Sequence, residues 1–299
     1  MFIIRDDKMD ERTEKTKNAG IYGIIGNVFL LIIKAIVGFV SRSQAMIADS
    51  INSAGDIFAS FMTFIGNKIA SEPVDDDHNF GHGKAEYIFS MFISISMILV
   101  SAKLLYDSVM TLVLGSELKF SWFLVIVCII TIITKISLYI YVKRINKKYK
   151  NILLEANMED HRNDCIVTTF TLISVLLTRV NIYWFDSIVG IGISIWICYT
   201  GVKIFLESYN VLMDRSVDEK TKDIILDLAH SYKDIKSIKD IISSPVGYKY
   251  IIFLTIQVDG EMSTKNSHNL ADCLELDISK LEKVYKAIVH VEPYNENKE

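Results

Sequence analysis

Residues 48–60 read Ala48-Asp49-Ser50-Ile51-Asn52-Ser53-Ala54-Gly55-Asp56-Ile57-Phe58-Ala59-Ser60. They lie within an apolar segment, from about Gln44 to Ile69, that is long enough to cross a bilayer as a helix. The spacing i, i+3, i+7 places Asp49, Asn52 and Asp56 on one helix face. A carboxylate near the centre of a membrane helix costs about 2.5–3.5 kcal/mol on insertion scales. These polar groups therefore need a partner within the bilayer.

A second stretch supplies candidate partners. Asp160 and Asp164 are four residues apart, at the start of an apolar run that continues to about Leu177. Oxygen donors converging from two helices can replace much of the hydration shell of a divalent cation. The alternative is that the acids pack against a basic side chain. Lys135 lies in the lower half of another apolar segment, and we expect no Lys or Arg at the depth of the acids. The pattern predicts a cation site formed by Asn52, Asp56, Asp160 and Asp164, with Asp49 supporting it from outside the ligand set.

The composition places the chain in a membrane. Of its 299 residues, 51% are hydrophobic and the mean hydropathy is +0.30, which is too apolar for an ordinary soluble domain. The net charge of −4 says little about partners, and the four cysteines show no CxxC spacing that would indicate a disulfide framework or a thiolate metal site. The charged start lacks the apolar core of a cleavable signal peptide. Six segments are predicted to span the membrane: 19–40, 44–69, 83–114, 120–141, 153–178 and 184–206.

The distribution of basic residues predicts the topology. Residues 142–150 read Val-Lys-Arg-Ile-Asn-Lys-Lys-Tyr-Lys, whereas the opposite loops hold only Arg42, Lys119 and Arg179. The positive-inside rule places this cluster, expected to be a loop, in the cytoplasm. With six spans, both termini and the 71–83 loop share that side.

The pattern changes to that of an α+β domain after Asp218. Helical periodicity covers 219–232 and 264–281, and β-branched runs predict strands at 235–243, 248–258 and 285–291. We expect one small sheet with helices on one face. This part has no Gly-rich phosphate loop and no basic stripe, so neither nucleotide nor nucleic-acid binding is supported. His268, His290 and Glu292 could meet there, although each alone is typical of a surface residue.

The acidic loop after the second apolar segment is another candidate metal site. Asp75, His78 and His82 could chelate an ion, although Gly81 argues against a continuous helix between the two imidazoles. Asn79 stands where the zinc-protease motif HExxH requires Glu. A metal site and a solvated polar loop both fit this spacing.

Taken together, these residues resemble the cation diffusion facilitator family of divalent-metal/proton antiporters. Four separated matches in the same order carry the resemblance across nearly the whole chain: residues 43–60, 77–86, 160–164 and 290–293. It implies a membrane all-α six-helix bundle plus a C-terminal cytoplasmic α+β ferredoxin-like domain that dimerises. The expected divisions are an N-terminal cytoplasmic arm (1–18), a transport domain (19–210) and the dimerisation domain (211–299).

The resemblance also implies the substrate. The family's transport site maps onto Asn52, Asp56, Asp160 and Asp164, and zinc transporters of the family have His at the position of Asp160. Oxygen donors suit harder ions such as Mn²⁺, and the set is similar to that of the manganese-exporting branch. His161 lies about 100° further round the helix and is not expected to replace Asp160. We expect Mn²⁺ as substrate, with iron, zinc and cobalt as the alternatives.

Three further sets of residues follow from the resemblance. Asp75, His78 and His82 match a second metal site of the family. His268, His290 and Glu292 match positions that bind metal and help to close the dimer in relatives, so a regulatory metal is expected there. A further ligand position falls near Thr255, a poor ligand, which argues against a complete binuclear site. Lys84 and Asp214 match a charge pair at the junction of membrane and cytoplasm.

The predicted function is efflux of Mn²⁺ from the cytoplasm by alternating-access exchange for protons. The expected partners are the metal ion, protons, the lipid bilayer and a second copy of the chain in the cell membrane, without nucleic acid and with no required cofactor. An intramembrane metalloenzyme would need a water-activating base beside a site rich in nitrogen and sulfur ligands, and no such motif is present. A membrane-anchored metal sensor would have no use for polar ligands inside the membrane.

Overall fold

The structure is a computed structural model that describes residues 7–41, 44–114, 121–180 and 184–294. The description covers the backbone only at residues 7–10, 38, 40, 41, 44–52, 54, 178, 184 and 186. The described chain forms two compact units. One comprises residues up to 72 together with 85–209, and the other comprises 73–84 together with 210 onward.

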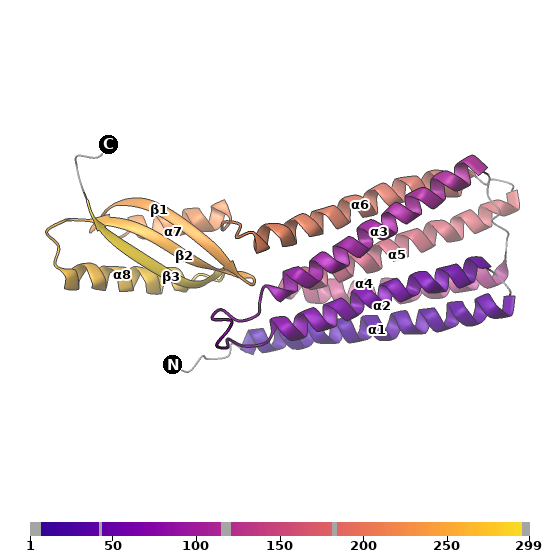
Figure 1. The fold of residues 1–299 in the computed structure, drawn as a ribbon, viewed down its shortest axis with the longest axis horizontal. Coiled ribbons are helices and arrows are strands. Elements are labelled where there is room, and N and C mark those ends of the chain that lie inside the picture. The colour runs from indigo at the N-terminus through magenta and orange to yellow at the C-terminus, as the bar shows by residue number, and fades with distance from the viewer. Residues whose placement is uncertain (1–6, 42–43, 115–120, 181–183, 295–299) are drawn as a thin grey trace. The chain divides into compact units, whose positions relative to one another are not determined.

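The first unit is a bundle of long helices that lie alongside one another (Figure 1). A short 3₁₀ turn, Thr178–Val180, follows the fifth of them. The helices are α1 (Asp7–Ser41), α2 (Gln44–Ala70), α3 (Ala85–Leu114), α4 (Trp122–Tyr149), α5 (Ile152–Leu177) and α6 (Trp184–Leu212). The six predicted apolar segments are therefore all helical.

Four helices of this bundle combine the length and the apolar character needed to cross a membrane, among the residues that the structure describes. The four stretches are Glu11–Val37, Ala85–Leu114, Trp122–Tyr149 and Ser187–Leu212. The remaining two helices, α2 and α5, have 27 and 26 residues. They carry the acidic residues of the predicted cation site.

Two helices extend further than the sequence pattern indicates. Helix α1 begins at Asp7, so the described part of the predicted N-terminal arm is helical and continuous with the first apolar segment. Helix α4 runs to Tyr149, and the basic cluster predicted as a loop forms its last two turns. Lys and Arg are good helix formers, and nothing interrupts the helix until Lys150, whose φ of 46° ends it. The prediction of a 142–150 loop was wrong for this reason.

The helices pack through a buried apolar cluster and through small residues. The cluster joins α2, α3, α5 and α6 through Ala59, Ile93, Met97, Ile152, Leu153, Ala156, Ile193, Ile197 and Ile204. Helices α1 and α2 approach closely at Gly20, where an added Cβ would lie 3.0 Å from the backbone nitrogen of Phe64. Such close approach is typical of small residues between membrane helices.

The second unit is the predicted α+β domain. Its elements are α7 (Glu219–His230), β1 (Ile235–Val246), β2 (Lys249–Val258), α8 (Thr264–Ser279) and β3 (Val284–Pro293). The sheet order is β1-β2-β3, with β1 antiparallel to β2 and β2 parallel to β3 across the α8 connection. This arrangement confirms the predicted order of helices and strands.

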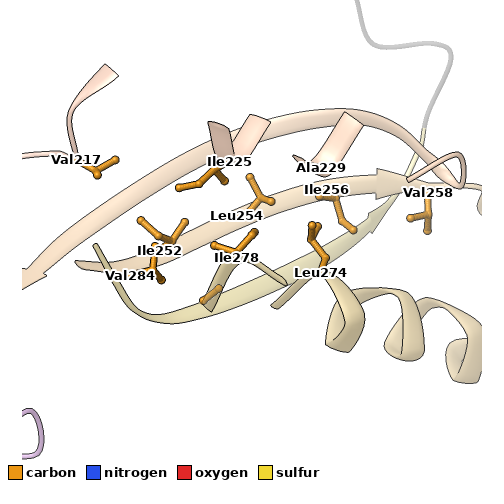
Figure 2. Close-up of a cluster of buried hydrophobic side chains, with 11 residues drawn as sticks. Val217, Ile225, Ala229, Ile252, Leu254, Ile256, Val258, Leu274, Ile278 and Val284 are labelled. Carbon is orange, nitrogen blue, oxygen red and sulfur yellow. The ribbon is translucent and has the colours of Figure 1, made fainter. Parts of the chain in front are cut away.

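The core of this domain lies between the sheet and its two helices (Figure 2). Every second residue of β2 faces the helices: Ile252, Leu254 and Ile256 are at most 1% exposed. The opposite face leaves a row of apolar side chains exposed: Ile242 pairs with Phe253, which pairs with Ile288. One face of the sheet is therefore covered by helices, and the other is partly apolar and open.

A tight contact fixes the 73–84 loop against the β1–β2 hairpin. Gly247 forms the turn with a φ of 61°, a conformation that L side chains rarely adopt. A Cβ added there would lie 3.2 Å from the Cα of Gly83. Glycine at both positions allows the two backbones to meet.

Candidate metal centre

The structure joins Asp56 on α2 and Asp164 on α5 through a lysine on α4. The ammonium nitrogen of Lys135 donates to Asp56 Oδ2 at 2.8 Å and also donates to Asp164 Oδ2. The Lys135 side chain is 1% exposed, whereas the two carboxylate side chains are 19% and 28% exposed. The expectation that no basic residue lies at the depth of the acids was wrong. A buried ammonium needs anionic partners, and helix α4 brings it to the two carboxylates.

The backbone beside Asp56 is fixed by a residue of α1. Asn27 is fully buried, and its Nδ2 donates to the Asp56 carbonyl oxygen at 2.9 Å and to Ser60 Oγ at 3.1 Å. Helix α1 can come close to this point because residue 23 is a glycine. A Cβ added at Gly23 would lie 2.5 Å from Ser60 Oγ, which is too close for a real contact. Asn27 is not among the residues predicted from the sequence. An amide in an apolar segment beside glycines is the signal that could have indicated it.

Helix α5 presents a second group of ligand types next to Asp164. One potential ligand atom each from Asp160, His161 and Asp164 lie within 4.8 Å of one another. The His161 side chain is fully buried, and neither ring nitrogen has a hydrogen-bonding partner among the described residues. The Asp160 Oδ2 atom is buried without one as well. Although the two side chains start on different parts of the helix surface, the imidazole is long enough to reach the carboxylates. An imidazole is thus available where only oxygen donors were expected.

The other two predicted residues of this site lie outside the described side chains. The backbone of Asn52 and Asp49 is helical in α2, and their side chains are not described. Asn52 as ligand and Asp49 as support therefore stay predictions. The described side chains already place one acid from α2 and two acids from α5 at one location.

The 73–84 loop gathers its three predicted ligands. One potential ligand atom each from Asp75, His78 and His82 lie within 4.8 Å of one another, and the two imidazole rings are 4.2 Å apart. Gly81, with a φ of 72°, turns the chain so that no helix forms between the rings. Desolvation raises the pKa of the Asp75 carboxyl, but hydrogen bonds from the His78 backbone and side chain outweigh it and hold the pKa below its usual value. A carboxylate between two imidazoles can chelate a divalent ion.

Of the three predicted ligands of the α+β domain, His290 and Glu292 lie close together, with 3.8 Å between Nε2 and Oε1, and His268 forms no metal-ligand group with them among the described residues. His268 on α8 lies 3.4 Å from Asp272, on the helical layer. His290 and Glu292 on β3 lie on the open face of the sheet, where Lys239 donates to Glu292 at 2.7 Å. Thr255 is the neighbour of His290 in the strand register. The three predicted ligands therefore do not form one site within the described part of this chain.

The predicted charge pair is formed. The Lys84 nitrogen lies 3.0 Å from Asp214 Oδ1, and Ser244 donates to the same oxygen at 3.1 Å. The hydrogen bond from Lys84 holds the pKa of the Asp214 carboxyl below its usual value. Asp214 itself has a φ of 55°, in the region that Asp tolerates better than most residues. The pair connects the 73–84 loop to the segment between α6 and α7, within the second unit.

Comparisons with known proteins match both parts of the chain. The sequence profile of the cation efflux transmembrane domain matches residues 20–213, and that of the cation efflux protein cytoplasmic domain matches residues 217–294. An uncharacterised transporter of Methanocaldococcus jannaschii is 30% identical over 91% of this chain and 96% of its own length. The manganese efflux system protein MneP of Bacillus subtilis is 26% identical over 96% of this chain and 99% of its own. The magnetosome protein MamM of Paramagnetospirillum magneticum is 25% identical over 87% of this chain and 82% of its own length.

Solved structures match about a quarter of the chain. The metal-bound C-terminal domain of the CzcD transporter from Thermotoga maritima is 26% identical, with a TM-score of 0.25. It covers 26% of this chain and 93% of its own length.

Proposed function

The chain belongs to the cation efflux, or cation diffusion facilitator, family, and from this premise we propose that it exports Mn²⁺ from the cytoplasm in exchange for protons. Members of this family are transporters of divalent metal cations and not enzymes. The observation that carries the proposal is the meeting of Asp56 from one helix with Asp164 from another around a single cationic group. Carboxylates so arranged in a membrane bundle are suited to binding a transported cation.

The donor chemistry supports Mn²⁺ as the substrate. Asp56, Asp160 and Asp164 supply carboxylate oxygens, with Asn52 as the predicted fourth ligand, and oxygen donors suit Mn²⁺ better than they suit zinc. The buried imidazole of His161 adds a nitrogen donor that Mn²⁺, iron and zinc all accept. Two relatives, MneP and MneS of Bacillus subtilis, are manganese efflux proteins, each 26% identical to this chain. Iron and zinc are the alternative substrates.

The proposed mechanism is alternating access. A cytoplasmic metal ion loses water and binds the carboxylates of α2 and α5, and a movement of these helices then exposes the site to the outside. Protons compete with the metal for the same carboxylate oxygens, so external protons release the metal and accompany the site on its return. Each step moves little net charge through the bilayer because a cation always accompanies the acids.

The proposed setting is the cell membrane with both termini in the cytoplasm. The basic turns at the end of α4 support this orientation, since Lys143, Arg144, Lys147 and Lys148 gather at one end of the bundle. We assign all six helices to the membrane, including α2 and α5, whose acids would then lie within it. The family profile of the transmembrane domain covers the whole of this region from residue 20.

The proposed assembly is a homodimer formed through the cytoplasmic domain. The exposed row of Ile242, Phe253 and Ile288 on the open sheet face offers apolar area for a second copy. His290 and Glu292 lie on the same face, so a regulatory metal would bind where two copies meet. The 73–84 loop, with Asp75, His78 and His82 gathered, is the second proposed regulatory metal site.

The test is metal transport by the purified full-length protein in proteoliposomes with an imposed pH gradient. We expect Mn²⁺ flux that depends on the gradient and exceeds that of zinc, iron or cobalt. Asp56→Ala and Asp160→Ala should abolish it while leaving expression intact. Asp107→Ala removes an exposed acid from α3 and serves as the matched control. Gradient-dependent Mn²⁺ flux that survives in Asp56→Ala would refute the proposed site.

A further inference from the structure

Lys135 occupies the position between two carboxylates that a transported cation would need. Its ammonium group bonds Asp56 Oδ2 and Asp164 Oδ2 at once, and these atoms come from the two helices proposed to hold the metal. A dication and an ammonium group cannot both bridge the same pair of oxygens. Binding of metal through these two oxygens therefore requires the ammonium group to leave at least one of them.

The lysine and the two carboxylates differ in how far they are buried. The Lys135 side chain is 1% exposed and reaches the acids from the protein interior. The Asp56 and Asp164 side chains are 19% and 28% exposed, so they are less completely enclosed than the ammonium group between them. The lysine side chain is a flexible four-carbon stem that can withdraw without moving the helix backbone.

We propose that Lys135 is a built-in counter-ion that takes the place of the transported metal between Asp56 and Asp164, and so sets the apparent metal affinity and supports the return of the empty carrier. This inference rests on the proposed function. When metal leaves, the ammonium group and the incoming protons together neutralise the acids, which is needed in a low-dielectric site. When metal arrives, the same group competes with it. Lys135 is a positioning residue that acts through the two carboxylates.

The first test is the metal affinity of Lys135 variants of the full-length protein in nanodiscs, together with KM and kcat in proteoliposomes. Lys135→Met keeps the apolar stem and removes the competing charge. We expect its Mn²⁺ dissociation constant and KM to fall by about tenfold, because a unit charge a few ångströms from the metal is removed. Its kcat should also fall, because the proton-loaded carrier then returns with one compensating positive charge fewer beside the acids. A purely structural ion pair would lower kcat or the yield of folded protein without tightening metal binding.

The second variant keeps the charge. The guanidinium of Lys135→Arg binds carboxylates through a planar fork and withdraws less easily, so metal binding should weaken. Lys143→Met, on the same helix and exposed, removes a lysine that bonds only Tyr139 in the described chain and should leave KM and kcat unchanged. If Lys135→Met does not fold, the proposal is still overturned by an unaltered dissociation constant in Lys135→Arg.

A third measurement needs no substitution. In the unmodified protein, Mn²⁺ should increase the reductive methylation of Lys135, quantified by mass spectrometry, while Lys143 stays constant as the internal reference. Equal modification of Lys135 with and without Mn²⁺ would overturn the proposal. Failure of the proposed function is distinguishable, because the unmodified protein would then move no metal at all. If it moves metal and both Lys135 variants bind Mn²⁺ like the unmodified protein, only the counter-ion assignment fails.

Discussion

Arg12 on α1 and Glu86 on α3 form a two-pronged ion pair, with both Nη–Oε distances at 2.6 Å. Their side chains are only 12% and 5% exposed. Asn151, which precedes α5, donates to Glu86 Oε1 at 3.2 Å and accepts from the Leu153 backbone nitrogen at 2.8 Å. One buried carboxylate thus connects the beginnings of three helices.

Glu86→Ala should destabilise the protein strongly, because it leaves the Arg12 charge buried without its carboxylate partner. Breaking one side of a buried ion pair costs about 3–5 kcal/mol. Thermal unfolding in detergent would show a large fall in Tm. The matched control is Lys148→Ala, which breaks a solvent-exposed pair with Glu11 and should lower the Tm far less. Equal shifts for the two variants would contradict a special role for the buried pair, and Arg12→Met/Glu86→Met should recover much of the loss.

Asp160→His should shift the preference of the transporter from Mn²⁺ toward Zn²⁺. The substitution places a second imidazole beside His161. Imidazole nitrogen binds zinc well, whereas carboxylate oxygens suit Mn²⁺, so the change should raise the affinity for zinc relative to Mn²⁺. Competition between the two ions in proteoliposome uptake measures the change. Asp107→His adds an imidazole to an exposed position of α3 and should not alter the ratio. An unchanged ratio in Asp160→His would show that ligand type at this position does not determine selectivity.

The elements of both units follow from local patterns in the sequence, and the contacts between elements do not. Apolar length predicts α1 to α6, and alternation predicts β1 to β3, because each depends on neighbouring residues alone. The pairing of Lys135 with Asp56 and Asp164 depends on how α4 is rotated and how deep each residue lies. The spacing of residues along one helix does not determine which face a neighbouring helix turns toward it. The same reason explains why Asn27 was not identified.

For the candidate metal sites, the sequence likewise predicts groupings of neighbouring residues better than contacts between helices. Asp160 and Asp164 are brought together as expected from their i, i+4 spacing, and the Asp75, His78 and His82 group forms although no regular element orders it. His161 was judged only by its angle on the helix, which ignores the reach of its ring. The end of α4 was misplaced because a basic cluster indicates the side of the membrane but does not break a helix.

Gly247→Ala should destabilise the cytoplasmic unit and loosen the 73–84 loop. A non-glycine residue in the left-handed region costs about 1–2 kcal/mol, and the new methyl group would press on Gly83. We expect a lower Tm and faster limited proteolysis within residues 73–84. Gly260→Ala is the control, because its added Cβ would meet only Pro293, at 3.7 Å. Unchanged proteolysis in Gly247→Ala would mean that this contact does not hold the loop.

Tyr232 and Asp277 provide a pH-dependent contribution to the stability of the cytoplasmic unit. The Tyr232 hydroxyl donates to Asp277 Oδ2 at 2.6 Å, linking the segment after α7 to α8. This hydrogen bond, with desolvation, raises the pKa of Tyr232 from 10.0 to about 12. Because the folded-state pKa is the higher one, the contribution is complete below about pH 10 and is lost as the pH rises toward 12. Tyr232→Phe should lower the free energy of unfolding by about 1 kcal/mol at neutral pH.

The measurement is urea unfolding of the full-length protein and of Tyr232→Phe, followed by circular dichroism from pH 8 upward. The difference between the two midpoints should stay constant to about pH 10 and then shrink, because the unmodified protein loses the hydrogen bond that the variant never had. Tyr285→Phe, at an exposed tyrosine of β3, controls for loss of a hydroxyl without this partner. A difference that persists unchanged above pH 11 would show that the tyrosine hydroxyl does not donate to Asp277 in the folded protein.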